Sequence, residues 1–270
     1  MVAGQIQPAG DKVPIAETLI AAVRTVVARR ADLLRLGLAL VLVVFFFGAL
    51  GRERGLNIGT TPGQAGAVAS PARTLYTLVI MGLDTLFISI FAVLWHRLIL
   101  LGPNSVGGGL GLRVGTRELL YWGRMWLCVL ILVMVAGAVA VVATALYPSG
   151  KAKSTALGVV AIICIVAVPY CCGRWGPIFA ATAIDQELSF VRAWRVTAGN
   201  GGRLFGINLL TGLGWLAVAS LFHVVALGLG LTAAAPYATL FTTDVISCVA
   251  LTVLVTINAL VFRRLTGGPV

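Results

Sequence analysis

Charged residues are scarce in this chain of 270 residues, making up 11% of it, whereas hydrophobic residues make up 59%. Soluble domains carry about 25% charged residues. A water-soluble fold of this composition has too little polar surface to cover itself. The composition therefore excludes an ordinary soluble globule and indicates a protein that is exposed to lipid.

Groups for catalysis and metal binding are also few. The two histidines, His96 and His223, lie far apart in apolar runs, whereas a hydrolytic metal centre needs clustered His, Glu and Asp. The five cysteines lack metal-ligand spacing, and no nucleophile elbow frames a serine. The glycine run 107–111 lacks the Lys-Ser/Thr of a P-loop. We expect no enzyme, no metal and no cofactor.

Long apolar runs are what the chain does have. A hydrocarbon core of about 30 Å needs roughly 20 apolar residues to cross it. Six runs meet this length, at about 33–50, 74–101, 118–147, 154–184, 203–230 and 236–262. The sequence predicts an all-α polytopic membrane helix bundle of six spans over residues 14–270, after a flexible tail at 1–13. Pro169 and Pro177 predict a kink or break in the fourth span.

Two amphipathic segments stand outside the spans, at about 14–31 and 186–199. In the first, apolar residues recur at helical spacing from Ile15 to Val27, and we expect it to lie in the membrane interface. A solvated helix at a protein contact is the alternative. Trp95 and His96 are expected in an interfacial belt. Seven arginines are expected to meet lipid headgroups or the interface: Arg24, Arg29, Arg30, Arg97, Arg192, Arg195 and Arg203.

The net charge of +11 is distributed unevenly. In a soluble protein it would point to nucleic acid, but here the basic residues cluster at the ends of apolar runs. With the N-terminus inside, 15 of the 20 Lys and Arg residues fall on the inner side. This bias predicts that both termini lie in the cytoplasm of a bacterial inner membrane. Anionic lipid, not nucleic acid, is the expected partner.

The stretch 174–205 carries a specific pattern. Arg174 and Pro177 lie late in the fourth span, Asp185 follows, and residues 193–200 read Ala-Trp-Arg-Val-Thr-Ala-Gly-Asn, with Trp194, Thr197, Gly199 and Asn200 at the marked positions. This resembles the membrane domain of glycerophosphoryl diester phosphodiesterases and its standalone bacterial relatives, whose pattern is Ser-Trp-x-x-Thr-x-Gly-Asn. The serine is replaced here by Ala193. The resemblance implies a six-span fold and a membrane address, and little about function.

Ionisable groups inside spans are costly in lipid and so are candidates for function. They are Asp84, Arg174, His223 and Asp244. One hypothesis is a polar path in which Asp84 and Asp244 bind a proton or cation and Arg174 is the counter-charge. The favoured hypothesis is a buried ion pair of Arg174 with Asp84 or Asp244 that fixes helix register.

Two functions follow. The first is a non-enzymatic scaffold, regulatory or lipid-associated membrane module that works with another membrane protein. The alternative is a small transporter or channel that uses the polar path. Small residues in the fifth span permit a homo-oligomer, although packing within one subunit is the simpler explanation.

Overall fold

The computed structural model describes residues 12–53, 71–107, 114–146 and 150–267. Most of the expected flexible tail, the loop 54–70 and most of the glycine run 107–111 lie outside the described residues. The elements are α1 (Ile15–Ala28), α2 (Arg30–Glu53), α3 (Pro71–Leu101), η1 (Pro103–Ser105), α4 (Thr116–Leu146), α5 (Gly150–Ala183), α6 (Phe190–Val196), α7 (Gly201–Gly228), α8 (Leu231–Ala234) and α9 (Pro236–Thr266).

Six of these helices, α2, α3, α4, α5, α7 and α9, are long and apolar enough to cross a membrane. The predicted six-span helical fold is confirmed, and the chain is an all-α integral membrane protein. The first span is longer than expected, because α2 starts at Arg30, directly after Arg29 closes α1, and continues to Glu53.

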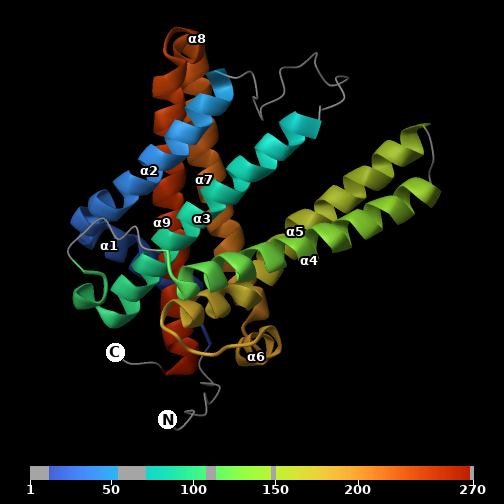
Figure 1. Ribbon diagram of the computed structural model, residues 1–270. Coiled ribbons are helices and arrows are strands. Elements are labelled where there is room, and N and C mark those ends of the chain that lie inside the picture. Colours follow the sequence, from blue (N-terminus) through green and yellow to red (C-terminus); the bar gives the residue numbers. More distant parts are fainter. Residues whose placement is uncertain (1–11, 54–70, 108–113, 147–149, 268–270) are drawn as a thin grey trace.

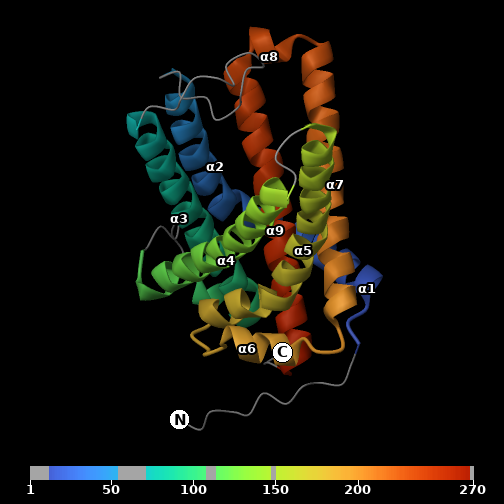
Figure 2. The same ribbon diagram turned by 90° about the vertical axis from the view of Figure 1, so that its right-hand side faces the viewer.

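Of the two alternatives predicted for the fourth span, a kink or a break, the break is not found: α5 continues as one helix through Pro169 and Pro177. Figure 2 shows that α5 bends along its length. Proline is tolerated inside membrane helices when neighbouring helices hold the flanking turns, and α4, α7 and α9 all pack on α5. The second amphipathic helix spans only Phe190–Val196, not 186–199. Ser189 starts it, because its hydroxyl accepts from the Arg192 N–H and caps the first turn.

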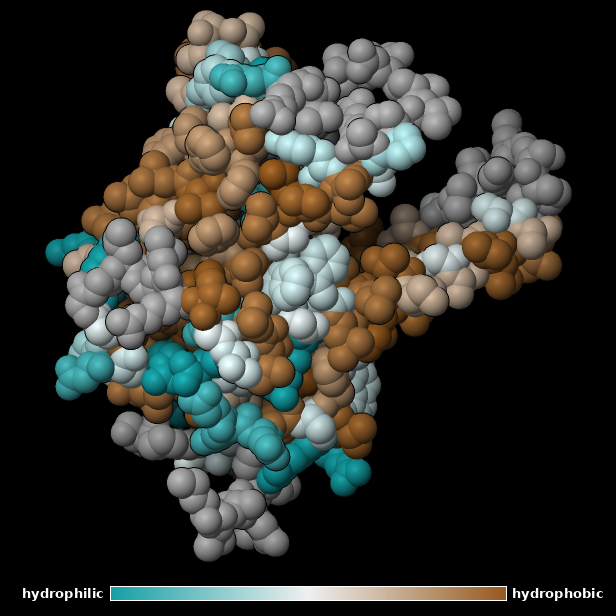
Figure 3. All heavy atoms as spheres, viewed as in Figure 1, coloured by the Kyte–Doolittle hydropathy of each residue, from teal (hydrophilic) through white to brown (hydrophobic). Residues whose placement is uncertain are grey.

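Helix α9 is the axis of the bundle. It contacts α1, α2, α3, α5 and α7 (Figures 1 and 2). The chain leaves α9 at the end of the bundle where α6 also lies, and α8 caps the other end. We call the α6 end the polar end, because hydrophilic residues gather there in Figure 3.

Burial is concentrated in the half of the bundle next to the polar end, which we call the packed half. The buried residues of α3 run mostly from Ser89 to Leu98, and those of α9 from Cys248 to Leu265. Trp95 and His96 belong to this core, so their predicted place in an interfacial belt is wrong. Trp95 Nε1 donates to Thr256 Oγ1 at 2.8 Å and joins α3 to α9.

The other half, which we call the open half, packs loosely. Helix α4 and the first part of α5 lean away from the bundle as an arm and contact each other (Figure 1). Their side chains remain exposed even where they are large and apolar, as at Met134 (65%), Val141 (67%) and Ile162 (63%). Figure 3 shows this arm as a hydrophobic projection.

Candidate functional site

The patterned stretch 174–205 forms a junction at the polar end. The Arg174 guanidinium is buried and donates from Nη2 to the Trp194 carbonyl at 2.6 Å and from Nη1 to the Thr197 carbonyl at 2.9 Å. It also lies 4.2 Å from the centre of the Trp194 ring. The carbonyls at a helix C-terminus lack partners within the helix and carry partial negative charge, so a cation is stabilised there.

The expected ion pair of Arg174 with Asp84 or Asp244 is therefore wrong. Among the described residues, no ion pair joins Arg174 to either carboxylate. The arginine bonds instead to the carbonyls of Trp194, in the last turn of α6, and of Thr197, directly after it, because α6 packs on α5. The cost of burying its charge is offset by backbone carbonyls and an aromatic face.

Asn200 extends the junction to the N-terminal segment. Its Oδ1 accepts from the backbone N–H of Val13 at 2.9 Å, and Arg203 Nη1 donates to the Val13 carbonyl at 3.2 Å. Val13 is fully buried and packs with the core of α7 and α9. Two side chains thus hold both backbone groups of Val13, and the segment that leads into α1 is fixed to the start of α7.

Glycines allow the chain to turn here. Gly199 adopts a φ of +78°, which L side chains rarely adopt. A Cβ on Gly201 would lie 3.1 Å from Tyr170 Oη and 3.2 Å from Arg174 Nη1, so α7 approaches α5 closely at this residue. Thr197 is fully buried, and its hydroxyl donates a hydrogen bond to the Ala193 carbonyl.

Asp185 forms a second polar contact, after α5. Its carboxylate accepts from Arg117 Nε at 2.8 Å and Nη2 at 2.6 Å, and Arg97 Nη1 lies 3.5 Å away. These hydrogen bonds and charges hold the pKa of Asp185 below its ordinary value of 3.8. Arg97 also donates to the Ala183 carbonyl. Asp185 thus joins α3 and α4 to the end of α5.

The arginines expected at headgroups divide into two groups. Arg97 and Arg203 donate to backbone carbonyls within the protein, as described above, and Arg29 lies 3.7 Å from Asp32. Exposed side chains remain at Arg24, Arg30 and Arg195, and Arg192 is half-buried. Pro177, from the same pattern, is buried within α5.

Asp84 lies on α3 and Asp244 on α9, two helices that contact each other. Each is half-buried, and each has one carboxylate oxygen, Asp84 Oδ1 and Asp244 Oδ2, that is buried without a hydrogen-bond partner among the described residues. His223 is exposed on α7 and does not join them. The predicted set of four ionisable groups is therefore two carboxylates, one arginine bound elsewhere and one outward-facing histidine.

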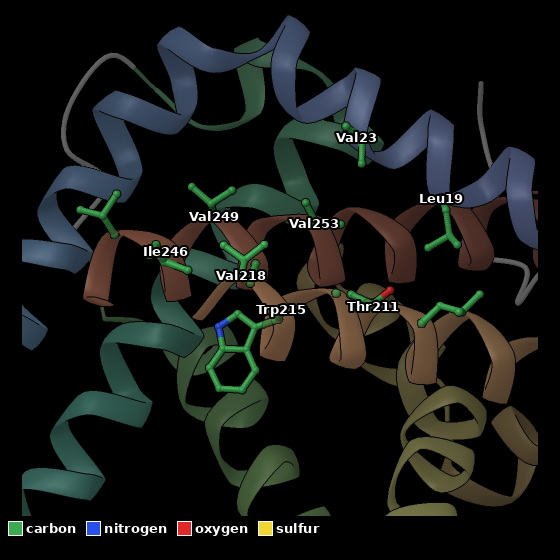
Figure 4. Close-up of a pocket in the computed structure, with 12 residues that line it drawn as sticks. Leu19, Val23, Thr211, Trp215, Val218, Ile246, Val249 and Val253 are labelled. Carbon is green, nitrogen blue, oxygen red and sulfur yellow. The ribbon is translucent and has the colours of Figure 1, made fainter. Parts of the chain in front are cut away.

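Two of the cavities that border α7 and α9 lie about halfway along these helices, between residues 208 and 218 of α7 and residues 245 and 254 of α9. The first, a groove of about 490 Å³, lies between α1, α7 and α9 (Figure 4). The second, of about 370 Å³, lies between α5, α7 and α9, and shares Thr211, Trp215 and Ala250 with the first. Their walls are almost wholly apolar, so they suit hydrocarbon, not a charged solute.

Comparisons with models of protein families, with curated proteins and with solved structures find no match.

Several residues of the junction were not found from the sequence. Ser189 carried a recognisable signal, because serine before a short helical segment is a common cap. Val13, Tyr170 and Arg117 carried none, since their roles depend on which helices become neighbours.

Proposed function

We propose that the chain is a non-enzymatic membrane module that associates with anionic lipid at its polar end and acts as a scaffold or regulatory partner of another membrane protein. The observation that carries the proposal is the placement of exposed arginines beside exposed apolar residues on α1 and α6. The resemblance of residues 174–205 to a phosphodiesterase-associated membrane domain agrees with such a role.

Helix α1 has the two faces that an interfacial helix needs. Thr18, Ala22 and Val26 are buried against the bundle. Val23 and Val27 are more than half exposed, and exposed Arg24 follows Val23. A helix with an apolar strip next to a cation fits the boundary between acyl chains and anionic headgroups.

Helix α6 repeats this arrangement at a smaller scale. Val191 is 61% and Trp194 39% exposed, and exposed Arg195 lies beside them. Both helices lie at the polar end, where the basic residues outnumber the acidic ones. We place this end in the cytoplasm of a bacterial inner membrane, because Lys and Arg are enriched on the cytoplasmic side.

The arm of α4 and α5 is the surface that we assign to a partner, whose transmembrane helices would pack on it. Helices associate in lipid through close packing, and the arm leaves apolar side chains such as Val135 and Leu146 unpacked. A photo-crosslinking residue at Met134 should join to one discrete protein, whereas one at Val224, an exposed site on α7, should label lipid. Label at Met134 that enters only lipid would contradict the scaffold role.

The lipid proposal is tested by mass spectrometry of lipids retained after purification in mild detergent. The wild-type protein should retain anionic phospholipid above its fraction in the membrane. Changing Arg24, Arg30 and Arg195 to glutamine should remove the excess, at about 1 kcal/mol for each arginine. Arg52→Gln, at the exposed end of α2 near the start of α9, is the control for loss of a positive charge away from the polar end and should retain lipid as wild type does. Equal retention by all variants would contradict the proposal.

The second candidate function is proton or cation transport, favoured only by the unpartnered oxygens of Asp84 and Asp244. Carboxylates that lack partners at membrane depth are costly unless they bind a proton or a cation. Arg174 is not the counter-charge in this transport hypothesis, because it bonds to the Trp194 and Thr197 carbonyls. Flux into vesicles should fall in Asp84→Asn and Asp244→Asn and stay unchanged in His223→Gln. Absence of any flux in the wild-type protein would remove this candidate.

A further inference from the structure

The groove between α1, α7 and α9 has a definite size, direction and position. Its volume of about 490 Å³ suits one small ligand or one acyl chain. Along α7 it runs from Leu210 to Val218, and along α9 from Val253 to Val245. Eight helical residues span about 12 Å, so the groove lies along the bundle axis, as an acyl chain lies in a bilayer.

The groove begins at the interfacial helix. Leu19 and Val23 of α1 close its polar end, and Figure 4 shows both pointing from α1 toward α9. From there it extends into the open half, where the helices leave their apolar side chains unpacked. The Thr211 hydroxyl in its wall already bonds to the Ile207 carbonyl, so the lining favours hydrocarbon.

An exposed cation neighbours a residue of the groove. Arg24 is exposed and directly follows Val23, which lines the groove, on α1. Consecutive Cα atoms are about 3.8 Å apart, so a headgroup next to Val23 is within reach of the long Arg24 side chain. The phosphate of a lipid complements this positive charge.

We propose that the groove is a binding site for one anionic phospholipid, with an acyl chain between α1, α7 and α9 and the phosphate at Arg24. The inference rests on the proposed association with anionic lipid and adds a defined site to it. The lipid fills the space that the helices leave between α7 and α9, and so it joins α1 to the open half of the bundle.

Trp215 makes the site measurable, because it lines the groove. Brominated acyl chains quench tryptophan on contact. The protein is reconstituted in phosphatidylcholine vesicles that contain a fixed minor fraction of brominated phosphatidylglycerol or brominated phosphatidylcholine. The chain has six tryptophans, so the Trp215 component is the difference between wild type and Trp215→Phe.

We expect the brominated anionic lipid to be about fivefold preferred at Trp215, the preference that about 1 kcal/mol from one arginine gives. Arg24→Gln should abolish the preference. Gly214→Leu should abolish the quenching, because Gly214 lines the groove and has open space at its Cβ. Gly228→Leu, on the same helix and also open, is the matched control and should behave as wild type.

Equal quenching of Trp215 by both brominated lipids would overturn the site, and so would unchanged preference in Gly214→Leu or Arg24→Gln. Thermal melting of each variant shows that it folds. Lipid retention separates the two claims. If anionic lipid is retained in excess but Trp215 shows no preference, only this site fails. If neither effect is found, the proposed lipid association fails with it.

Discussion

The packed half and the open half of the molecule use the same kinds of helix in opposite ways. In the packed half, Arg174 is buried among backbone carbonyls and the Trp194 ring, and Asp185 bonds to Arg117. In the open half, large apolar side chains are exposed, and two cavities beside α7 reach into it from the middle of the bundle. Asp84 and Asp244 keep unpartnered oxygens. Hydropathy makes six of the helices membrane spans, but the partners of their polar groups decide which part of each span is held in place.

Substitution of Arg174 is expected to cause the largest loss of stability. Arg174→Met removes two charge-assisted hydrogen bonds, at about 1.5 kcal/mol or more each, and leaves the carbonyls of Trp194 and Thr197 without these donors. The melting temperature in detergent should fall steeply. Arg195→Met, at an exposed site on α6, is the matched control and should change stability by less than about 0.5 kcal/mol. Equal melting temperatures for the two variants would contradict the claim that polar contacts stabilise the packed half.

Asn200→Ala should cause the next largest loss of stability. It leaves the buried N–H of Val13 without its acceptor, which costs about 1–3 kcal/mol. The segment before α1 should then become sensitive to protease while the spans remain protected. Asn208→Ala is the control, because among the described residues the Asn208 side chain donates to the Leu204 carbonyl within its own helix and to no other element. Equal protease sensitivity in both variants would show that the Val13 contact does not hold the segment.

At Asp84 and Asp244, in contrast, substitution should stabilise the folded protein. Asp84→Asn or Asp244→Asn removes a charge that has no partner, so the protein should be stabilised by roughly 1 kcal/mol. That is less than the ~2.5–3.5 kcal/mol cost of a charged aspartate at a helix centre, because both residues are half-buried. Thermal melting at neutral pH is the measurement. Strong destabilisation by either change would indicate a bonding partner and contradict the account.

The smallest effect is a pH dependence from Asp185. Its folded-state pKa is lowered by Arg117, so its contribution is complete above the ordinary value of 3.8 and is lost as the pH falls through the lowered value. Asp185→Asn should destabilise by about 0.2–1 kcal/mol at pH 7, since the carboxylate is 60% exposed. Asparagine also adopts the left-handed conformation that Asp185 has (φ +60°). The difference in melting temperature between wild type and variant should shrink as the pH falls below 3.8; a difference that does not change with pH would exclude the charge as its cause.

The sequence predicted the six spans well, because length and hydropathy alone determine what can cross a bilayer. It did not predict that α9 is central or that His96 is buried, because hydropathy does not distinguish a side chain facing lipid from one facing a helix. The Arg174 pairing was missed for a related reason. A buried arginine in a span predicts an opposite charge as its partner, but the partners of Arg174 are backbone carbonyls at the end of α6, which begin 20 residues later in the chain.

The junction residues show which contacts could not be predicted from the sequence. The pattern from Trp194 to Asn200 was visible in the sequence, and the structure gives its members contacts. The partner of Asn200 is Val13, which is 187 residues away in the chain. No local pattern contains that distance, so the contact depends on the three-dimensional arrangement of α1 and α7.

The central claim is that the polar end, with its exposed arginines, faces the cytoplasm. It is tested most directly by labelling single cysteines with a membrane-impermeant maleimide, in a background without the five native cysteines. Gln186→Cys lies after α5 at the polar end, and Thr232→Cys lies in α8 at the other end. Thr232→Cys should be labelled in intact cells, and Gln186→Cys only after the membrane is opened. The reverse pattern, or labelling of both sites in intact cells, would contradict the account.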